Sequence, residues 1–138
     1  MDRMFLRVVF IGGVVLSVML VPVWAVAGLH APLLLPFAAL YASAACVVPA
    51  FALARTRRWQ RLPFPEWVRY GAAGLVCSLG ACLLFTGLIV SAPHNGWSVL
   101  TWHDFRDRVA WMTGVLVPAV VLTHLVIGWL DRRRARVR

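Results

Sequence analysis

The chain has 138 residues, 62% of them hydrophobic, and a formal net charge of +9. This composition leaves too little polar surface to cover a water-soluble globule, so it excludes an ordinary soluble domain and indicates a membrane protein. Nucleic-acid binding needs basic residues on a solvated, folded face. Here the basic residues stand at the ends of apolar runs, so the charge does not indicate that function.

Four apolar runs follow one another along the chain, at about residues 8–29, 31–54, 70–92 and 109–130. Each is long enough to cross a hydrocarbon core about 30 Å thick. The first run resembles a secretory signal peptide that ends in Ala25-Val26-Ala27, but we expect it to be retained as a helix. The sequence therefore predicts an all-α integral membrane domain with four transmembrane helices, arranged as two antiparallel hairpins.

The arginines predict how this domain is oriented. The chain has no lysine, and all of its arginines except Arg106 and Arg108 fall at the N-terminus, in residues 55–69 or in the tail at residues 131–138. By the positive-inside rule these three segments face the cytoplasm, so both termini are expected inside. We therefore predict a multi-pass protein of the bacterial inner membrane, in contact with anionic lipid headgroups.

The connections between spans supply candidate contact residues. Residues 93–108 are long enough to hold a short interfacial helix that offers Trp97 and Trp102 to lipid or to a partner. Arg106 and Arg108 extend this predicted outer contact surface. On the inner side, the tail arginines Arg132, Arg133 and Arg134 are the expected contacts.

Small residues recur at helical spacing in two of the predicted spans. In the third span they are Gly71, Gly74, Ser78 and Ala81. Such a face lets another helix approach closely, either within the bundle or from a different subunit. The second span repeats the pattern with Ala38, Ala42 and Ala45.

Polar side chains within the predicted spans are few. The hydroxyls are expected to bond to carbonyls in their own helical turn. Three cysteines, Cys46, Cys77 and Cys82, are interpreted as packing residues rather than as a disulfide framework. His124 is the only acidic or basic residue in the spans, and it needs a partner: a backbone carbonyl, the tail or a cofactor.

The other histidines, His30, His94 and His103, all map to the predicted outer side. They are interpreted either as exposed interfacial residues or as parts of one site. Zinc or copper would need three or four such groups converging on the ion, and no tight motif imposes that. No metal is therefore predicted.

The sequence at residues 85–130 resembles the closing hairpin of small b-type cytochrome membrane anchors. The resemblance lies in Thr86-Gly87-Leu88, Trp102-His103, His124-Leu125 and Trp129. It implies a haem b held by helix histidines, between a quinone pool and a redox partner. His103 and His124 fall near opposite membrane faces, so they cannot ligate one haem, whereas His30 with His94 or His103 could do so near the outer side.

Three functional hypotheses follow. The first is a small non-catalytic accessory or scaffolding subunit of a larger inner-membrane complex, which packs against partner helices and lipid. The second is a haem b or quinone-binding membrane anchor of a redox complex. The third is a small transporter or lipid flippase, although a proton-coupled one would be expected to carry a carboxylate within its spans.

Overall fold

A computed structural model describes the backbone of residues 3–26, 34–91 and 102–137, without the side chains of residues 23, 24, 26, 34, 35, 85–91 and 102–104. These residues are almost entirely helical. Four of their helical segments are long and apolar enough to cross a membrane: Arg3–Pro22, Pro36–Ala54, Glu66–Leu84 and Phe105–Arg136. The prediction of a multi-pass, all-helical membrane protein is confirmed at this level.

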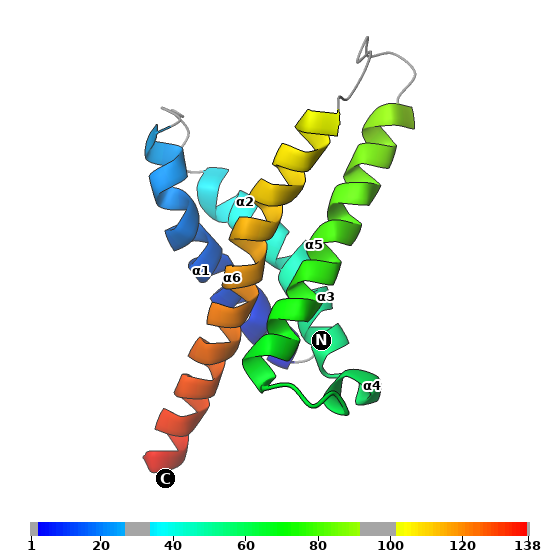
Figure 1. Cartoon of the computed structure of the whole chain (residues 1–138). Coiled ribbons are helices and arrows are strands. Elements are labelled where there is room, and N and C mark those ends of the chain that lie inside the picture. Colours follow the sequence, from blue (N-terminus) through cyan, green and yellow to red (C-terminus); the bar gives the residue numbers. More distant parts are fainter. Residues whose placement is uncertain (1–2, 27–33, 92–101, 138) are drawn as a thin grey trace.

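Three long helices and one composite helix form the bundle (Figure 1). Helix α6 lies between α1 and α5 and packs against both, while α2 packs on α1 and α3 on α5. A short turn of helix, α4, lies between α3 and α5. The bounds are α1 (Arg3–Val26), α2 (Leu34–Ala42), the π-helical segment η1 (Ser43–Val47), α3 (Val48–Ala54), α4 (Arg57–Gln60), α5 (Glu66–Ser91) and α6 (Trp102–Arg136).

Three helices extend beyond the bounds predicted from hydropathy. Helix α1 begins at Arg3 rather than at residue 8. Helix α5 begins at Glu66 rather than at residue 70, and the Pro65 carbonyl accepts hydrogen bonds from the amides of Val68 and Arg69, both at 3.1 Å. Helix α6 has 35 residues, which at 1.5 Å per residue is about 52 Å and exceeds the hydrocarbon core.

The extended α6 corrects two predictions. Residues 102–108, predicted to lie in an interfacial loop, belong to α6, and residues 131–136, predicted as a tail, continue the same helix. Hydropathy marks only where a helix is apolar, whereas backbone hydrogen bonding continues into polar sequence. The remaining predicted loop residues, 93–101, lie outside the described residues.

The second span is interrupted by the π-helical segment η1. The Val48 amide bonds to the Ser43 carbonyl five residues back, and Pro49 has no amide hydrogen to bond the carbonyl of Ala45. Ala38 and Ala45 are exposed, so the small-residue face predicted for this span does not pack inside the bundle. Contact of that face with another subunit stays a prediction. The residues buried in its place are Ala39, Ser43, Cys46, Val47 and Ala50.

Helix α1 approaches this buried face very closely. A methyl group added at Gly12 would lie 2.4 Å from the Ser43 hydroxyl oxygen. That hydroxyl donates a 3.0 Å hydrogen bond to the Val9 carbonyl of α1, rather than to its own helix. Only a residue without a side chain permits this contact, because the backbones could not otherwise approach so closely.

The contact between α5 and α6 confirms that small residues of the third span face another helix of the bundle. A methyl group at Gly74 would lie 3.2 Å from a Val120 side-chain carbon, and Ser78 is fully buried. The Ser78 hydroxyl donates to the Leu75 carbonyl at 3.0 Å and lies 3.3 Å from the Thr113 hydroxyl. Ser17 and Thr123 also bond to carbonyls in their own helices, as expected.

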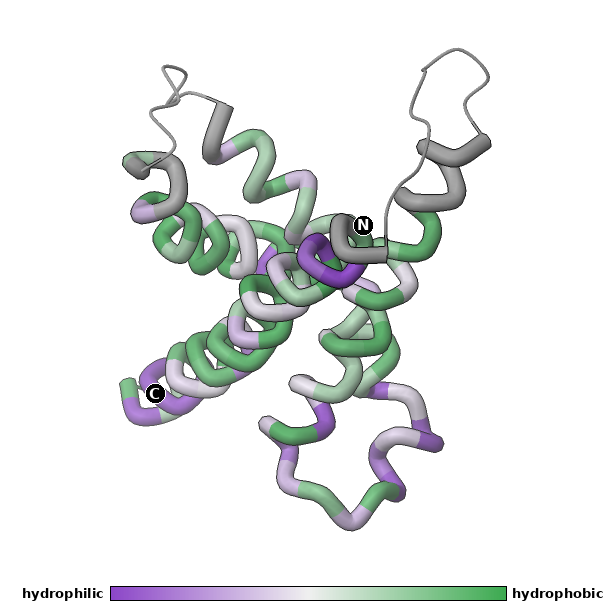
Figure 2. Tube along the Cα trace, turned by 45° about the horizontal axis from the view of Figure 1, so that its top comes forward, coloured by the Kyte–Doolittle hydropathy of each residue, from purple (hydrophilic) through white to green (hydrophobic). Residues whose placement is uncertain are grey.

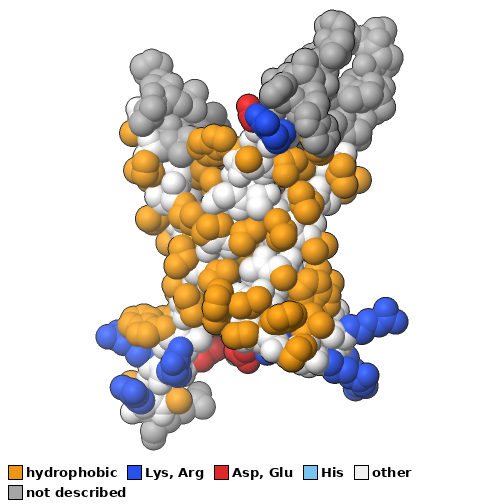
Figure 3. All heavy atoms as spheres, in the orientation of Figure 1, with side chains coloured by type: hydrophobic (Ala, Val, Ile, Leu, Met, Phe, Trp, Pro, Cys, Tyr) orange, Lys and Arg blue, Asp and Glu red, His pale blue; other side chains and the backbone are white. Residues whose placement is uncertain are grey.

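Apolar side chains cover the middle of the bundle, and arginines project at its lower end (Figure 3). Figure 2 shows the same contrast, with hydrophobic residues along the helices and hydrophilic ones at the described ends and in residues 55–65. Side chains such as Phe10, Val18 and Leu84 are mostly exposed, which suits contact with lipid. The three cysteines are free thiols, and Cys46 and Cys82 are buried.

We predict that Gly12→Ala destabilises the bundle by about 1–3 kcal/mol, because the added methyl group must displace Ser43 or separate α1 from η1. Equilibrium unfolding of the purified chain by sodium dodecyl sulfate in mixed micelles measures this change. Gly80→Ala is the matched control, since a methyl group there meets no atom within 4 Å. Equal stabilities for the two variants would contradict the assigned contact.

Candidate ligand cavity and helix-docking groove

Most of the predicted outer-side site lies outside the described residues. His30, His94 and Trp97 are in undescribed segments, and Trp102 and His103 stand in the first turn of α6 without described side chains. Arg106 and Arg108 are exposed on α6, with Arg106 3.5 Å from the carboxylate of Asp107. An outer site built on these histidines therefore stays a prediction.

The tail arginines lie on the last turns of α6. Arg132 donates a 3.2 Å hydrogen bond to the Gly128 carbonyl, and the Arg133 guanidinium lies 4.4 Å from the centroid of the Trp129 ring. Arg134 is exposed. Positive side chains at this position also interact favourably with the partial negative charge of a helix C-terminus.

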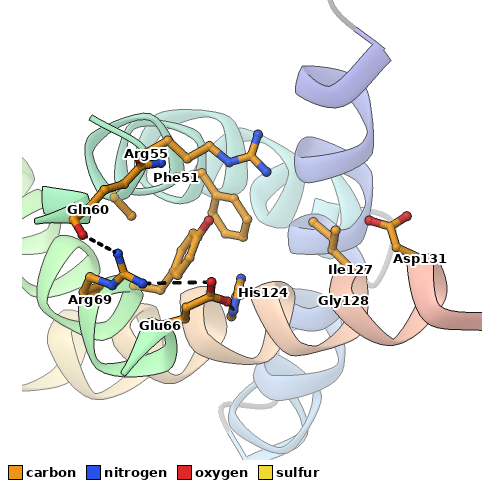
Figure 4. Close-up of a pocket in the computed structure, with 11 residues that line it drawn as sticks. Phe51, Arg55, Gln60, Glu66, Arg69, His124, Ile127, Gly128 and Asp131 are labelled. Atoms are coloured by element: carbon orange, nitrogen blue, oxygen red, sulfur yellow. Dashed lines mark hydrogen bonds and ion pairs between the residues drawn. The ribbon is translucent and has the colours of Figure 1, made fainter. Parts of the chain in front are cut away.

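A polar cavity of about 420 Å³ lies where α3, α5 and α6 meet (Figure 4). It is near the arginine-rich end of the bundle, since its lining includes residues at the end of α3, at the start of α5 and near the end of α6. The lining comprises Phe51, Ala54, Arg55, Gln60, Glu66, Arg69, Tyr70, His124, Ile127, Gly128 and Asp131.

His124 is held in this cavity by an aromatic stack. Its ring lies 3.9 Å from the Tyr70 ring at an interplanar angle of 17°, and Tyr70 in turn packs on Phe51 with centroids 4.7 Å apart. The partner expected from the sequence was a backbone carbonyl, the tail or a cofactor. Instead, His124 Nε2 lies 3.6 Å from Glu66 Oε2, so a carboxylate faces the imidazole. The pair is an ion pair whenever the imidazole is protonated.

The acidic residues of the cavity both have basic neighbours. Asp131 forms a 2.8 Å ion pair with Arg7, which ties α6 to α1. Glu66 lies 3.9 Å from Arg69 Nη2 in addition to its contact with His124. Both pairs are partly exposed to solvent, so each contributes at most about 1 kcal/mol to stability.

The two arginines of the cavity have fewer acceptors than donors. Arg69, whose side chain is 18% exposed, donates to the Gln60 carbonyl at 3.2 Å, while its buried Nε has no hydrogen-bond partner among the described residues. Arg55 bonds the thioether sulfur of Met4, a weak acceptor. Guanidinium groups with free donors are well suited to phosphate or carboxylate oxygens.

Of these cavity residues, only His124 was singled out from the sequence. The signal for Glu66 is that it is the one acidic residue within the arginine-rich segment 55–69. Glu66, Arg69 and Tyr70 are three and four residues apart, which places them on one helix face. That face was missed because the predicted helix began at residue 70.

A second concave surface, the α5–α6 groove, lies in the apolar middle of the bundle. Its volume is about 530 Å³, and it shares no lining residue with the cavity. A methyl group added at Gly114 would meet no atom within 4 Å, so the groove is open beside this glycine. The lining comprises Trp67, Val68, Gly71, Ala72 and Leu75 of α5 with Thr113, Gly114, Val117, Pro118 and Val121 of α6.

We expect His124→Ala to lower the free energy of unfolding by about 1–2 kcal/mol, because the stack on Tyr70 and Phe51 is lost. The same detergent unfolding titration measures the effect. His124→Phe should recover part of it, since a ring still fills the position. Leu125→Ala, at the exposed neighbouring residue, is the control. If Leu125→Ala lowered the free energy of unfolding more than His124→Ala does, the stabilising role of the stack would be refuted.

Among the described residues, no group of three or more His, Cys, Asp or Glu side chains is placed to hold a metal ion. Comparisons with protein-family models, with curated proteins and with solved structures give no match for this chain. The resemblance of its C-terminal hairpin to small b-type cytochrome anchors therefore stays a prediction.

Proposed function

We propose that this chain is a small non-catalytic accessory subunit of a larger inner-membrane assembly, and that it binds a transmembrane helix of another subunit in the α5–α6 groove. The observation that carries the proposal is the lining of that groove. It is apolar, and glycines on both helices, Gly71 and Gly114, leave it shallow enough for a third backbone to approach. Small residues on the surface of a span are characteristic of helix association in membranes.

The lining of the groove favours a transmembrane helix as its occupant. Almost all of its exposed surface is apolar, and Gly71 and Ala72 of α5 face Gly114 of α6 across it. Small residues let the backbone of another helix come close, and the van der Waals contacts made in this way drive helix association in membranes. We therefore assign the groove to a helix of another subunit.

The proposal includes an orientation with both termini in the cytoplasm. In support, the ends of α1, α3 and α6 are adjacent, as shown by the Arg7–Asp131 ion pair and the Arg55–Met4 hydrogen bond. The three arginine-rich segments thus lie toward the same end of the bundle (Figure 3). The positive-inside rule assigns such an end to the cytoplasmic face.

Reporter fusions test the orientation. We expect alkaline phosphatase fused after Arg138 to be inactive and green fluorescent protein at the same point to fluoresce. Phosphatase inserted after Asn95, in the connection between α5 and α6, should be active. The reverse pattern at both points would overturn the assigned orientation.

Gly114→Leu tests the accessory role, because a Cβ at this position meets no described atom within 4 Å and the larger side chain occupies space in the groove. We expect the variant to fold normally and to lose association with the larger assembly. The measurement is blue-native electrophoresis of native membranes in mild detergent, with a photo-crosslinking residue at position 72 to identify the chain seated in the groove. Gly80→Leu, at an open position outside the groove, is the matched control.

The proposal predicts a crosslink to another integral membrane protein that is lost in Gly114→Leu and kept in Gly80→Leu. A crosslink only to a second copy of this chain, or only to lipid, would contradict it. So would a chain that migrates alone in native membranes.

A further inference from the structure

We propose that the polar cavity between α3, α5 and α6 is a binding site for a phosphate group, with Arg55 and Arg69 as the two arginines of its lining. This inference concerns a different surface from the α5–α6 groove and does not depend on the accessory role. It rests on the charges that line the cavity, on the aromatic floor and on the position of the cavity in the bundle.

The charges of the cavity favour an anion. Its two carboxylates already have basic neighbours: Asp131 faces Arg7 at 2.8 Å, and Glu66 faces His124 and Arg69. Among the described residues, the Arg55 guanidinium has only the Met4 sulfur as a hydrogen-bond partner. The donors left over on the two guanidinium groups can be satisfied by an added acceptor, and a phosphate offers several charged oxygens to a guanidinium at once.

Arg69 is held in place before any ligand arrives. Its side chain is mostly buried, its Nη1 donates to the Gln60 carbonyl, and Figure 4 shows its guanidinium between Gln60 and Glu66. A fixed guanidinium loses little conformational freedom on binding, which favours a specific site over loose attraction to surface charge. Helix α5 begins beside it at Glu66 and adds the partial positive charge of a helix N-terminus.

Part of the remaining lining is aromatic or aliphatic, which suits a phosphate that carries a glycerol and acyl chains. Phe51 and Tyr70 form the aromatic floor together with His124, and Ile127 adds an aliphatic wall. The cavity also lies toward the arginine-rich end of the bundle, since Arg55, Arg69 and Asp131 are part of its lining. Basic pockets between transmembrane helices at this level are suited to anionic lipid headgroups. The same guanidinium groups would also bind free inorganic phosphate.

Native mass spectrometry of the full chain in a neutral detergent measures this binding. The probes are phosphatidylglycerol, phosphatidylcholine and, in a separate arm, inorganic phosphate. We expect phosphatidylglycerol to bind more tightly than phosphatidylcholine and Arg55→Gln to weaken it about tenfold or more, the loss expected for a hydrogen bond to a charged group. Arg69→Gln should act in the same direction.

The matched control is Arg58→Gln, which removes the same charge from an exposed position outside the cavity. It should change the affinity less than about twofold, as expected for a screened surface charge. Because Arg55 is exposed, Arg55→Gln is expected to fold, and size-exclusion chromatography with circular dichroism verifies this before binding is compared. If phosphatidylglycerol binds in a way that depends on Arg55, the site is assigned to a lipid headgroup. If only inorganic phosphate binds in this way, the site is assigned to free phosphate.

Binding that is unchanged in Arg55→Gln and Arg69→Gln, or equally weakened in Arg58→Gln, would overturn the proposal. The result is separable from that of the accessory role. Gly114→Leu should bind phosphatidylglycerol as the unmodified chain does, since Gly114 lines the groove and not the cavity.

Discussion

Close approach of helices through small residues is the constraint on which this bundle depends. Lipid is as apolar as the helix surfaces, so burying a leucine against another helix has little of the advantage that it has in water. Stability must come from short van der Waals contacts and from hydrogen bonds between helices. Gly12 against Ser43 and Gly74 against Val120 supply the first, and the bond from Ser43 to the α1 backbone supplies the second. The buried core is accordingly rich in Ala, Ser, Cys and Val.

The helices of this bundle leave two concave surfaces with different chemistry, the α5–α6 groove and the polar cavity. Where α5 and α6 touch at Gly74, the helix surfaces beside the contact leave an apolar groove at membrane depth. Toward the arginine-rich end, the helices extend past the apolar stretch, and their charged residues enclose a cavity over an aromatic floor. Charges are tolerated there because side chains near the membrane boundary reach water, whereas the groove offers them no such contact.

Local sequence was a good guide to the face of α5 and a poor guide to the face of the second span. The prediction from Gly71, Gly74 and Ser78 worked because α5 is a regular helix, so spacing of three and four residues translates directly into one face. The pattern of Ala38, Ala42 and Ala45 does not mark the bundle face, because the buried residues, such as Ala39 and Ser43, stand one position further along the helix. In a span that is apolar all round, small residues alone do not tell which side faces the other helices.

Four apolar spans and the clustering of arginines were determined by the sequence alone, because hydropathy and charge are properties of each segment by itself. The position and lining of the cavity, in contrast, were determined only by the tertiary structure. Glu66 and Tyr70 meet His124 because helix α5 starts a turn earlier than its apolar stretch and packs on α6 at one register. That register is set by contacts between residues distant in the chain, such as Gly74 with Val120. No pattern within a single segment contains this information.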